Sequence, residues 1–580
     1  MKYLFSYESP NAQYINIEFI VEDVNSAELM LQLPSWRPGR YELGNFARNI
    51  RSWKAFDENN QPLHFEKVTK DLWKVNTSGV SSVTIKYSYY AAELNAGSTW
   101  LDESQMYVNP VNCCFYVPGR MDEPCLVELK VPESYEIGTS LVKLEKNLLM
   151  ASDFQQLADS PFIASATLQH EFFVYESIEF HIWFQGIRHP DWTKLFSDFF
   201  IFVNEQYLLF GDFPVKEYHF LFQILPYSIY HGVEHLNSTV IALGPAYDVF
   251  EGNLYNELLG VSSHELFHVW NIKKIRPAEM YPYDFTRENY SRLGYVAEGF
   301  TTYYGDLMLF RSKAISEEAY FKILGQQLKK HFDNPGRFNH SVAESSFDTW
   351  LDGYVPGIPN RKVSIYTEGC LIAFMIDILI RRGTNNEKSL DDVMRVLYYK
   401  FGKKDIGYTE KDVLAIISAI AGRSLEDFFK LYIYGIEDFR PMLQECLEYL
   451  GLNLKETSTG KYSETYLGFK SIEEGAQVTV KSIYPDSPAD KAGLMINDVI
   501  TSINGNRLSN NIENWCRFYS KEEKVLRLGV FSSFRQKELI ISVQKHKQEY
   551  FKNYVVEKSA VETELKQMAF KSWAGVYVRR

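Results

Sequence analysis

The sequence predicts a multidomain α+β protein, on three observations. At 580 residues the chain exceeds what one hydrophobic core usually organises, so three or four domains are expected. The first part, to about residue 170, alternates apolar and polar residues as β-strands do, whereas residues from 253 to about 450 carry helical signals. A polar stretch then precedes a compact C-terminal module. We therefore expect a β-rich domain, a mostly helical domain and a small third domain.

The first region, residues 1–170, is predicted to be a β-sandwich. Short alternating segments such as 29–33, 83–89 and 126–131 are separated by turn residues. Alternation places every second side chain on one face of a sheet. The aromatic content of 15% fits a large core rich in β-structure.

The second region is assigned to residues 171–454. Strand-like segments, for example 220–224, continue to about residue 250, and helices dominate beyond that point. One apolar helix is expected around residues 258–270, and a second from Gly294 to Phe310. A linker is expected over 455–463, followed by a module at 464–546. The tail, 547–580, is expected to hold a helix over 560–570 that docks back.

Composition and charge exclude several classes of function. The formal charge of −13 disfavours nucleic acids and anionic membranes as partners. The N-terminus passes directly into a strand pattern, and no apolar run of about 20 residues is present, so we expect neither a signal peptide nor a membrane span. The six cysteines are irregularly spaced, which favours reduced thiols and a cytoplasmic location.

The most informative motif is His264-Glu265-Leu266-Phe267-His268. Histidines at i and i+4 project from one face of a helix. With a carboxylate such as Glu298, they form the set that holds a catalytic zinc and leaves one position open for water. Glu265 lies where it can accept a proton from that water. The alternative is a buried helix with hydrogen-bonded histidines, but burying these groups is costly unless they are paired or bind a metal.

Other segments carry polar residues whose roles the sequence alone leaves open. Glu234 is either a site residue or a carboxylate on a strand edge, and Tyr366 is either a site residue or a core tyrosine. Asp306 can orient a ligand histidine, but we expect it on a solvated helix face. The loop from Trp36 to Arg40 can line the substrate cleft, but we expect it to be only a turn between strands.

The chain resembles the glycyl aminopeptidase family, zinc metallopeptidases of the gluzincin kind that carry a PDZ domain, and more distantly aminopeptidase N. Segments 34–41 and 45–50 match the N-terminal pattern, and segments 264–271 and 298–306 match the catalytic pattern. The resemblance implies a thermolysin-like, mostly helical catalytic domain behind the N-terminal sandwich. The number of residues between the HExxH motif and Glu298 is larger than in aminopeptidase N and resembles the spacing in the glycyl aminopeptidases.

Carried over residue by residue, the resemblance implies one zinc ion per chain and a set of site residues. The zinc ligands are His264, His268 and Glu298, and the general base is Glu265. The free α-amino group of the substrate is held by Glu234, on a strand edge that includes Gly232 and Val233. The oxyanion is hydrogen-bonded by Tyr366.

Two positions depart from the family pattern. His231 stands at a glycine of the relatives, which affects the shape of the strand edge. Glu368 stands at their lysine, so no cation at that position lowers the pKa of Tyr366. The hydroxyl of Tyr366 can still donate to an oxyanion.

The C-terminal module resembles a PDZ domain of bacterial proteases. The match runs through segments 466–469, 487–500 and 503–505. The expected carboxylate-binding loop is Leu467, Gly468 and Phe469, which holds peptide C-termini. Asn497 replaces a usual glycine, and asparagine tolerates a positive φ. The alternative is that the PDZ domain only packs against the rest of the protein and that its peptide groove is unused.

These features predict a zinc aminopeptidase that removes the first residue of peptides with a free N-terminus. The resemblance implies a preference for Gly or Ala at that residue. A zinc endopeptidase or another zinc hydrolase on the same site is one alternative. A non-catalytic scaffold that binds peptides through the PDZ domain is another, disfavoured because no ligand and no base has been lost.

Overall fold

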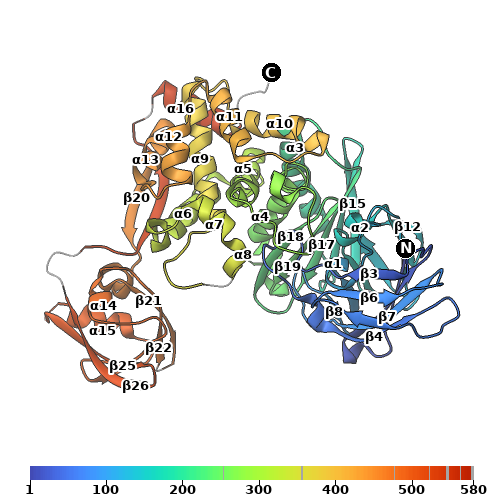
Figure 1. Ribbon diagram of the computed structural model, residues 1–580. Coiled ribbons are helices and arrows are strands. Elements are labelled where there is room, and N and C mark those ends of the chain that lie inside the picture. The colour runs from blue at the N-terminus through green and yellow to red at the C-terminus, as the bar shows by residue number, and fades with distance from the viewer. Residues whose placement is uncertain are drawn as a thin grey trace.

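The computed structural model describes residues 1–252, 254–354, 357–475, 477–521, 523–543, 548–561 and 563–575. A β-rich N-terminal part, a larger middle part of one sheet and many helices, and a small C-terminal β module follow one another along the chain (Figure 1). The predicted multidomain α+β architecture is confirmed.

The N-terminal part consists of three sheets around one core. The seven-stranded sheet has the order β12-β13-β10-β1-β2-β7-β4, and smaller sheets have the orders β3-β6-β5 and β11-β14-β9-β8. Alternation is clear in β2, where Ile15, Ile17 and Phe19 are buried and their neighbours are not. The elements are β1 Lys2–Ser6, β2 Tyr14–Val21, β3 Glu28–Gln32, β4 Ile50–Phe56, β5 Phe65–Lys67, β6 Leu72–Asn76, β7 Val83–Tyr90, β8 Trp100–Leu101, β9 Gln105–Val108, α1 Pro110–Cys113, β10 Cys125–Leu129, β11 Glu136–Thr139, β12 Val142–Glu145, β13 Leu148–Ala151, α2 Phe154–Ala158 and β14 Phe162–Ser165.

A five-stranded sheet opens the middle part, in the order β15-β16-β17-β19-β18. Its strands are β15 Gln169–Tyr175, β16 Ile178–Gln185, β17 Glu217–Ile224, β18 Ile229–Glu234 and β19 Ser238–Gly244. Among the described residues, strand β18 pairs only with β19, so its other edge is open to a further strand. A 19-residue helix, α3 Trp192–Phe210, interrupts this region, where only strands were expected. Its buried residues Leu195, Phe199 and Phe202 recur at helical spacing, a pattern that its many aromatic residues obscured.

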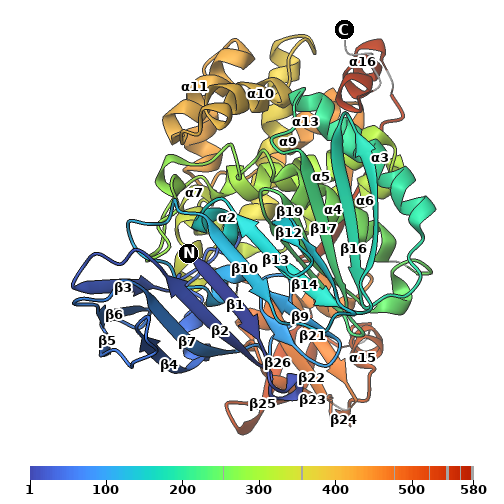
Figure 2. The ribbon, with the colours of Figure 1, turned by 90° about the vertical axis from the view of Figure 1, so that its right-hand side faces the viewer.

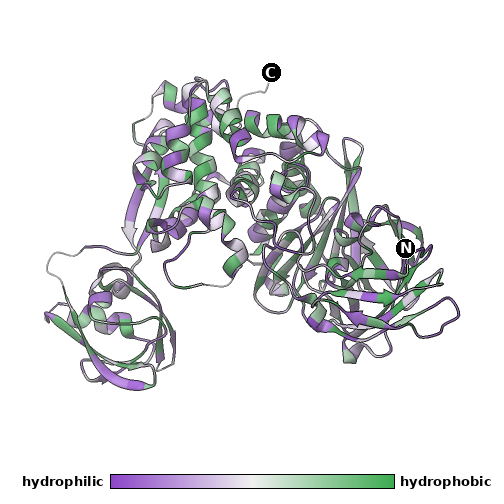
Figure 3. Cartoon of the chain, viewed as in Figure 1, coloured by the Kyte–Doolittle hydropathy of each residue, from purple (hydrophilic) through white to green (hydrophobic). Residues whose placement is uncertain are grey.

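Helices make up the rest of the middle part. They are α4 Leu254–Phe267, α5 Thr301–Ser312, α6 Glu317–Phe332, α7 Val342–Phe347, α8 Thr349–Asp352, α9 Ile365–Gly383, α10 Leu390–Lys400, α11 Glu410–Ala421, α12 Glu426–Phe428 and α13 Arg440–Tyr449. Helix α9 is buried along nearly its whole length and is coloured largely as hydrophobic in Figure 3. In the part of the chain that the structure describes, no helix has the length and apolar character needed to cross a lipid bilayer.

The second predicted helix, Gly294 to Phe310, begins differently from an ordinary helix. Tyr295–Phe300 forms a π-helical turn that leads directly into α5. Gly299 packs against Gly369 of α9 so closely that a Cβ on Gly299 would lie 2.3 Å from the Cα of Gly369. This close approach brings the first turn of α9 beside the π-helical turn, which carries Glu298.

The C-terminal part begins with a strand, so the predicted linker was wrong over its first residues. β20 Leu452–Ser458 pairs with β27 Lys552–Lys558, and these two strands frame the module (Figure 1). The module has a sheet in the order β21-β22-β23-β25-β26 with β24 beside β23. Its elements are β21 Phe469–Glu474, β22 Gln477–Ile483, α14 Pro488–Lys491, β23 Val499–Ile503, β24 Asn506–Arg507, α15 Ile512–Tyr519, β25 Val525–Ser532 and β26 Arg535–Ser542.

The tail returns to the helical part. α16 Glu564–Trp573 places Trp573 in the same core as α5 and α9. The indole of Trp573 donates a hydrogen bond to the hydroxyl of Tyr303, 2.9 Å away, and Arg311 donates to the carbonyl of Trp573. Figure 2 shows α16 at the same end of the molecule as α10 and α13. The expected boundary between module and tail, at residues 546 and 547, lies outside the described residues.

Candidate metal centre and active site

The two histidines of the HExxH motif lie one turn apart at the end of α4. Leu258, Leu259 and Leu266 are fully buried and hold this helix in the core. The Nε2 atoms of His264 and His268 are 3.1 Å apart. Nδ1 of His268 is 2.6 Å from the carbonyl oxygen of Asn271. That contact puts a proton on Nδ1 and leaves the lone pair of Nε2 facing His264.

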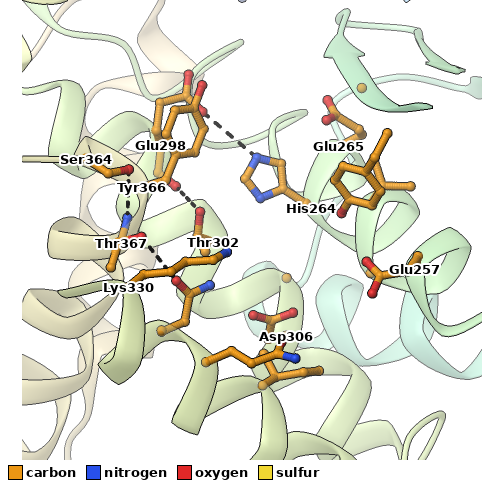
Figure 4. Close-up of a pocket in the computed structure, with 18 of the residues that line it drawn as sticks. Glu257, His264, Glu265, Glu298, Thr302, Asp306, Lys330, Ser364, Tyr366 and Thr367 are labelled. Carbon is orange, nitrogen blue, oxygen red and sulfur yellow. Dashed lines mark hydrogen bonds and ion pairs between the residues drawn. The ribbon is translucent and has the colours of Figure 1, made fainter. Parts of the chain in front are cut away.

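Glu298, on the π-helical turn, completes the group. Its Oε2 lies 3.4 Å from Nε2 of His268 and 3.9 Å from Nε2 of His264 (Figure 4). Ligands about 2.1 Å from a tetrahedral zinc ion are separated from one another by roughly 3.4 Å. The three atoms therefore have the spacing and the chemistry of a metal-binding set, and Glu298 and His268 are almost fully buried.

Charge in this cluster is strongly perturbed. Burial lowers the pKa of His264, and the neighbouring His268 lowers it further. Burial also acts to lower the pKa of His268, but Glu298 and Glu234 outweigh it and raise that pKa to about 10. Two imidazoles facing a buried carboxylate form a set that a metal cation would neutralise.

The predicted base, Glu265, is buried at 5% exposure beside this group. Burial raises its pKa well above the usual range, and Glu234 and Glu298 add to the rise. Among the described residues, nothing hydrogen-bonds its Oε2. Gly232 lies against it, since a Cβ on Gly232 would stand 2.1 Å from Oε1 of Glu265. The glycine is therefore needed for the carboxylate to occupy this position.

Glu234 lies at the end of edge strand β18 and is 4% exposed. Its Oε1 has no hydrogen-bond partner in the described part of the chain, and its side chain lines the same cavity as Glu265 and the histidines. The side chain of Val233 points away from that cavity into a core with Tyr107 and Val240. Of the three predicted strand-edge residues, Glu234 and Gly232 thus face the cavity and the Val233 side chain does not.

The loop from Trp36 to Arg40 was expected to be only a turn, and this was wrong. The loop does turn, with the amide of Arg40 bonded to the carbonyl of Arg37. It also lines the cavity through Gly39 and Arg40. Gly39 has a φ of +82° and leaves space for Glu234, whose Oε2 would lie 2.4 Å from a Cβ there. Just after the loop, the hydroxyl of Tyr41 donates to Oε1 of Glu298 over 2.9 Å. The sequence motif signalled this loop, but not its contact with Glu298.

Tyr366 lies in the first turn of α9, capped by Ser364, and lines the cavity. Its ring centroid is 6.4 Å from that of His264, and its hydroxyl lies 3.4 Å from the hydroxyl of Tyr354. Burial raises the pKa of Tyr366 well above its usual range, and Glu298 adds to the rise. The phenol therefore keeps its proton and can donate it in a hydrogen bond. Tyr354 was not predicted from the sequence.

One continuous cavity of about 960 Å³ joins these groups (Figure 4). It runs between β18 and the helices α4, α5, α6 and α9. Asp306 lines it, so the expectation of a solvated helix face was wrong. Asp306 bonds to neither ligand histidine in the described structure, and the carbonyl of Asn271 holds His268 instead.

Comparison with protein families finds three domain models along the chain. The Peptidase M61 N-terminal domain matches residues 2–166, and the M61 glycyl aminopeptidase domain matches residues 257–372. The second match includes the HExxH motif, Glu298 and Tyr366. The chain belongs to the M61 glycyl aminopeptidase family. A PDZ domain matches residues 479–530, which confirms the nature of the C-terminal module.

One solved structure extends the likeness of this M61 family member over nearly the whole chain. An aminopeptidase N family protein from Idiomarina loihiensis has a TM-score of 0.90 at 25% identity, over 99% of both chains. An M1 zinc metallopeptidase from Deinococcus radiodurans has a TM-score of 0.46 at 12% identity, over 75% of this chain and 93% of that one. Comparison with curated protein sequences gave no match.

Both departures from the M61 pattern have local explanations. Burial lowers the pKa of His231 to about 3, and the neighbouring arginines Arg37 and Arg40 lower it further, so His231 stays neutral beside Glu234. Glu368 accepts a hydrogen bond from Nδ1 of His331 over 2.8 Å, and both side chains are almost fully buried. The carboxylate of Glu368, two residues after Tyr366, therefore forms a hydrogen-bonded pair with His331 inside the helical core.

In the PDZ domain, Gly468 has a φ of +78° between the buried residues Leu467 and Phe469. A Cβ on Gly468 would lie 2.3 Å from Cβ of Ser487, so no other residue fits this turn. The carbonyl of Gly468 accepts a hydrogen bond from the amide of Tyr484. β21 follows at the edge of the module's sheet, where a peptide strand has room to pair.

Proposed function

We propose that this M61 protein is a zinc-dependent aminopeptidase that hydrolyses the first peptide bond of substrates with a free N-terminus. The observation that carries the proposal is Glu234, a buried carboxylate with an unpartnered oxygen, in the same cavity as the HExxH residues. A buried, unpaired carboxylate calls for a cation, and a peptide's ammonium group is such a cation.

His264, His268 and Glu298 would hold the metal ion, one per chain, because their three free atoms have the separations of zinc ligands. When bound, zinc supplies Lewis acidity toward a carbonyl oxygen and toward water. The donor set of two imidazoles and one carboxylate is the kind found in catalytic zinc sites with one open position.

Three side chains of the protein then perform the proton transfers and the positioning. Glu265 takes a proton from the attacking water and passes it to the leaving amine, a role that its place beside the metal-binding group supports. Tyr366 donates its hydroxyl proton in a hydrogen bond to the oxyanion, a contact worth roughly 3 kcal/mol in related sites. Glu234 holds the substrate's ammonium group and so limits cleavage to the first residue.

Preference for Gly or Ala at the first residue follows from the crowding around Glu234. Gly39 and Gly232 approach the two cavity carboxylates so closely that neither position has room for a Cβ. The N-terminal loop thus lies against the carboxylate that would hold the ammonium group, which supports a small first residue.

A panel of amino-acid anilides, assayed with and without a chelator, tests the proposal. Hydrolysis of Gly- and Ala-anilide that is lost with chelator and restored by zinc is expected. N-acetylated substrates separate the second candidate, a zinc endopeptidase on the same site. Glu234→Ala should reduce cleavage of free amines far more than of blocked peptides, and equal losses would argue for the endopeptidase. We also propose that the PDZ groove binds peptide C-termini, to be tested by titration with C-terminal peptides and their amides.

A further inference from the structure

The cavity continues well beyond the metal-binding residues. Glu298, Thr302 and Asp306 follow one another at four-residue steps along the π-helical turn and α5, and all line the cavity. Eight residues of helix span roughly 12 Å. On α4, the cavity lining likewise extends from His268 back to Glu257. The far end of the cavity is therefore several residues of peptide away from the metal-binding group.

A peptide that pairs with the free edge of β18 would run alongside this strand through the cavity. Glu234 lies at the C-terminal end of β18, and Tyr230 lies near its start, and both line the cavity. A peptide that pairs with this edge advances about 3.3 Å per residue. With its amine at Glu234, its second and third residues pass Val233 and Gly232, and the strand continues from there toward Tyr230. A lysine or arginine at either position has a long apolar stem that would carry its charged end toward the far end of the cavity.

Asp306 is less exposed than Glu257 and Lys330 at that end of the cavity, and Figure 4 draws it below His264, with Glu298 above. Within the described ranges, no hydrogen bond or ion pair within 4.0 Å engages its carboxylate, and no dashed line reaches it in Figure 4. Burial raises its pKa to about 7, an effect that Lys330 opposes and Glu257 reinforces. The Asp306 carboxylate is partly buried and has no partner among the described residues, so it can accept a cationic group from a bound peptide.

The other charges at this end lie nearer to solvent. Glu257 and Lys330 are exposed, and Lys330 is more than 4.0 Å from the Asp306 carboxylate, since the two form no ion pair. An exposed ammonium group is strongly hydrated, so it contributes little to a partly buried carboxylate at that distance. Lys330 therefore reduces, but does not satisfy, the negative potential around Asp306.

We propose that Asp306, reinforced by Glu257, selects peptides with a lysine or arginine as their second or third residue. This inference rests on the proposed function for the direction in which the peptide is held. The basic side chain lies farther along α5 than the metal-binding group, and its cationic end becomes the partner of Asp306. The substrate class is then a small first residue followed closely by a basic one.

The test compares three peptides, Ala-Lys-Ala-Ala, Ala-Ala-Lys-Ala and Ala-Ala-Ala-Ala, and a fourth with Glu in place of Lys. For the wild-type protein, kcat/KM for the better lysine peptide should exceed that for the glutamate peptide by at least about tenfold. Asp306→Asn should reduce this ratio to near one, and Lys330→Gln should increase it. Glu251→Gln, an exposed carboxylate outside the cavity, is the matched control and should leave the ratio unchanged.

Measurements of peptide binding distinguish a failure of this inference from a failure of the proposed aminopeptidase function. Calorimetric titration of the Glu265→Gln variant, with and without Asp306→Asn, measures the same preference without turnover. A lysine preference in binding that disappears with Asp306→Asn supports the inference even if no peptide is cleaved, in which case the aminopeptidase proposal fails alone. Equal binding of lysine and glutamate peptides, or a lysine preference that survives Asp306→Asn, overturns the inference.

Discussion

The hydroxyl of Tyr41 donates a hydrogen bond to Oε1 of Glu298 over 2.9 Å, although the two residues are 257 positions apart. Both side chains are buried, at 4% and 2% exposure, so water cannot compete for the contact. Because Oε1 is engaged, Oε2 is the oxygen that faces His264 and His268. The β-rich N-terminal part therefore helps to orient the metal-binding group.

Replacing Tyr41 with Phe should weaken zinc binding, because it frees the Glu298 carboxylate to rotate. A loss of about 10- to 100-fold in affinity is expected for such a contact. Competition with a chromogenic chelator measures it independently of activity. Tyr354→Phe removes another cavity phenol, one that bonds Tyr366 and no metal-binding residue, and serves as the control. Equal zinc affinity in the two variants would show that Tyr41 has no orienting role.

Gly232→Ala should reduce turnover while leaving metal content unchanged. The new methyl group would lie 2.1 Å from Oε1 of Glu265, so the carboxylate must move from its position beside the metal-binding group. A displacement of about 1 Å can cost roughly 100-fold in rate. Gly260→Ala on α4 is the control, because a Cβ there meets no atom within 4 Å. Loss of zinc from Gly232→Ala, measured by elemental analysis, would contradict this interpretation.

The part of the site that the sequence predicted well is the part encoded by local spacing. His264, Glu265 and His268 lie within one turn of helix, so helical geometry alone brings them to one side. Glu298 and Tyr366 were assigned through a family pattern, and the close packing of Gly299 on Gly369 is what brings their segments together. No local pattern reports such a packing contact.

Contacts between distant segments could not be predicted. The bond from Tyr41 to Glu298, the space that Gly39 leaves for Glu234, and the place of Asp306 in the cavity all depend on how separate elements pack. Helix α3 was missed for a related reason, because its apolar residues are aromatic and resemble those of the neighbouring strands. The multidomain architecture was predictable, because the spacing of apolar residues changes from strand-like to helical between one part of the chain and the next.

Glu265→Gln should retain zinc and lose nearly all turnover. An amide cannot accept the proton of the attacking water, and the loss for a general base is typically about 10²- to 10⁴-fold. Because the amide has the same shape and Glu265 is not among the proposed ligands, metal content should stay the same. Single-turnover kinetics with Ala-anilide and elemental analysis of the same sample measure both quantities. Turnover close to that of the wild type would refute the assignment of Glu265 as base.

Asp159→Asn should lower stability at neutral pH and have a smaller effect in acid. Oδ1 of Asp159 forms an ion pair with Nζ of Lys273 at 2.7 Å. The same oxygen lies 3.0 Å from Nδ1 of His235, the residue that follows Glu234. Burial raises its pKa, but Lys273 and His235 outweigh burial and hold it well below the usual range. A depressed carboxyl pKa stabilises the fold fully above the unfolded value, about 3.9, and this contribution is lost as pH falls below it. Breaking such a pair costs about 3 kcal/mol. Calorimetric midpoints of both proteins should therefore differ most from pH 5 to 7 and converge below pH 4, and a constant difference would show that the ionised form of Asp159 is not what stabilises the fold.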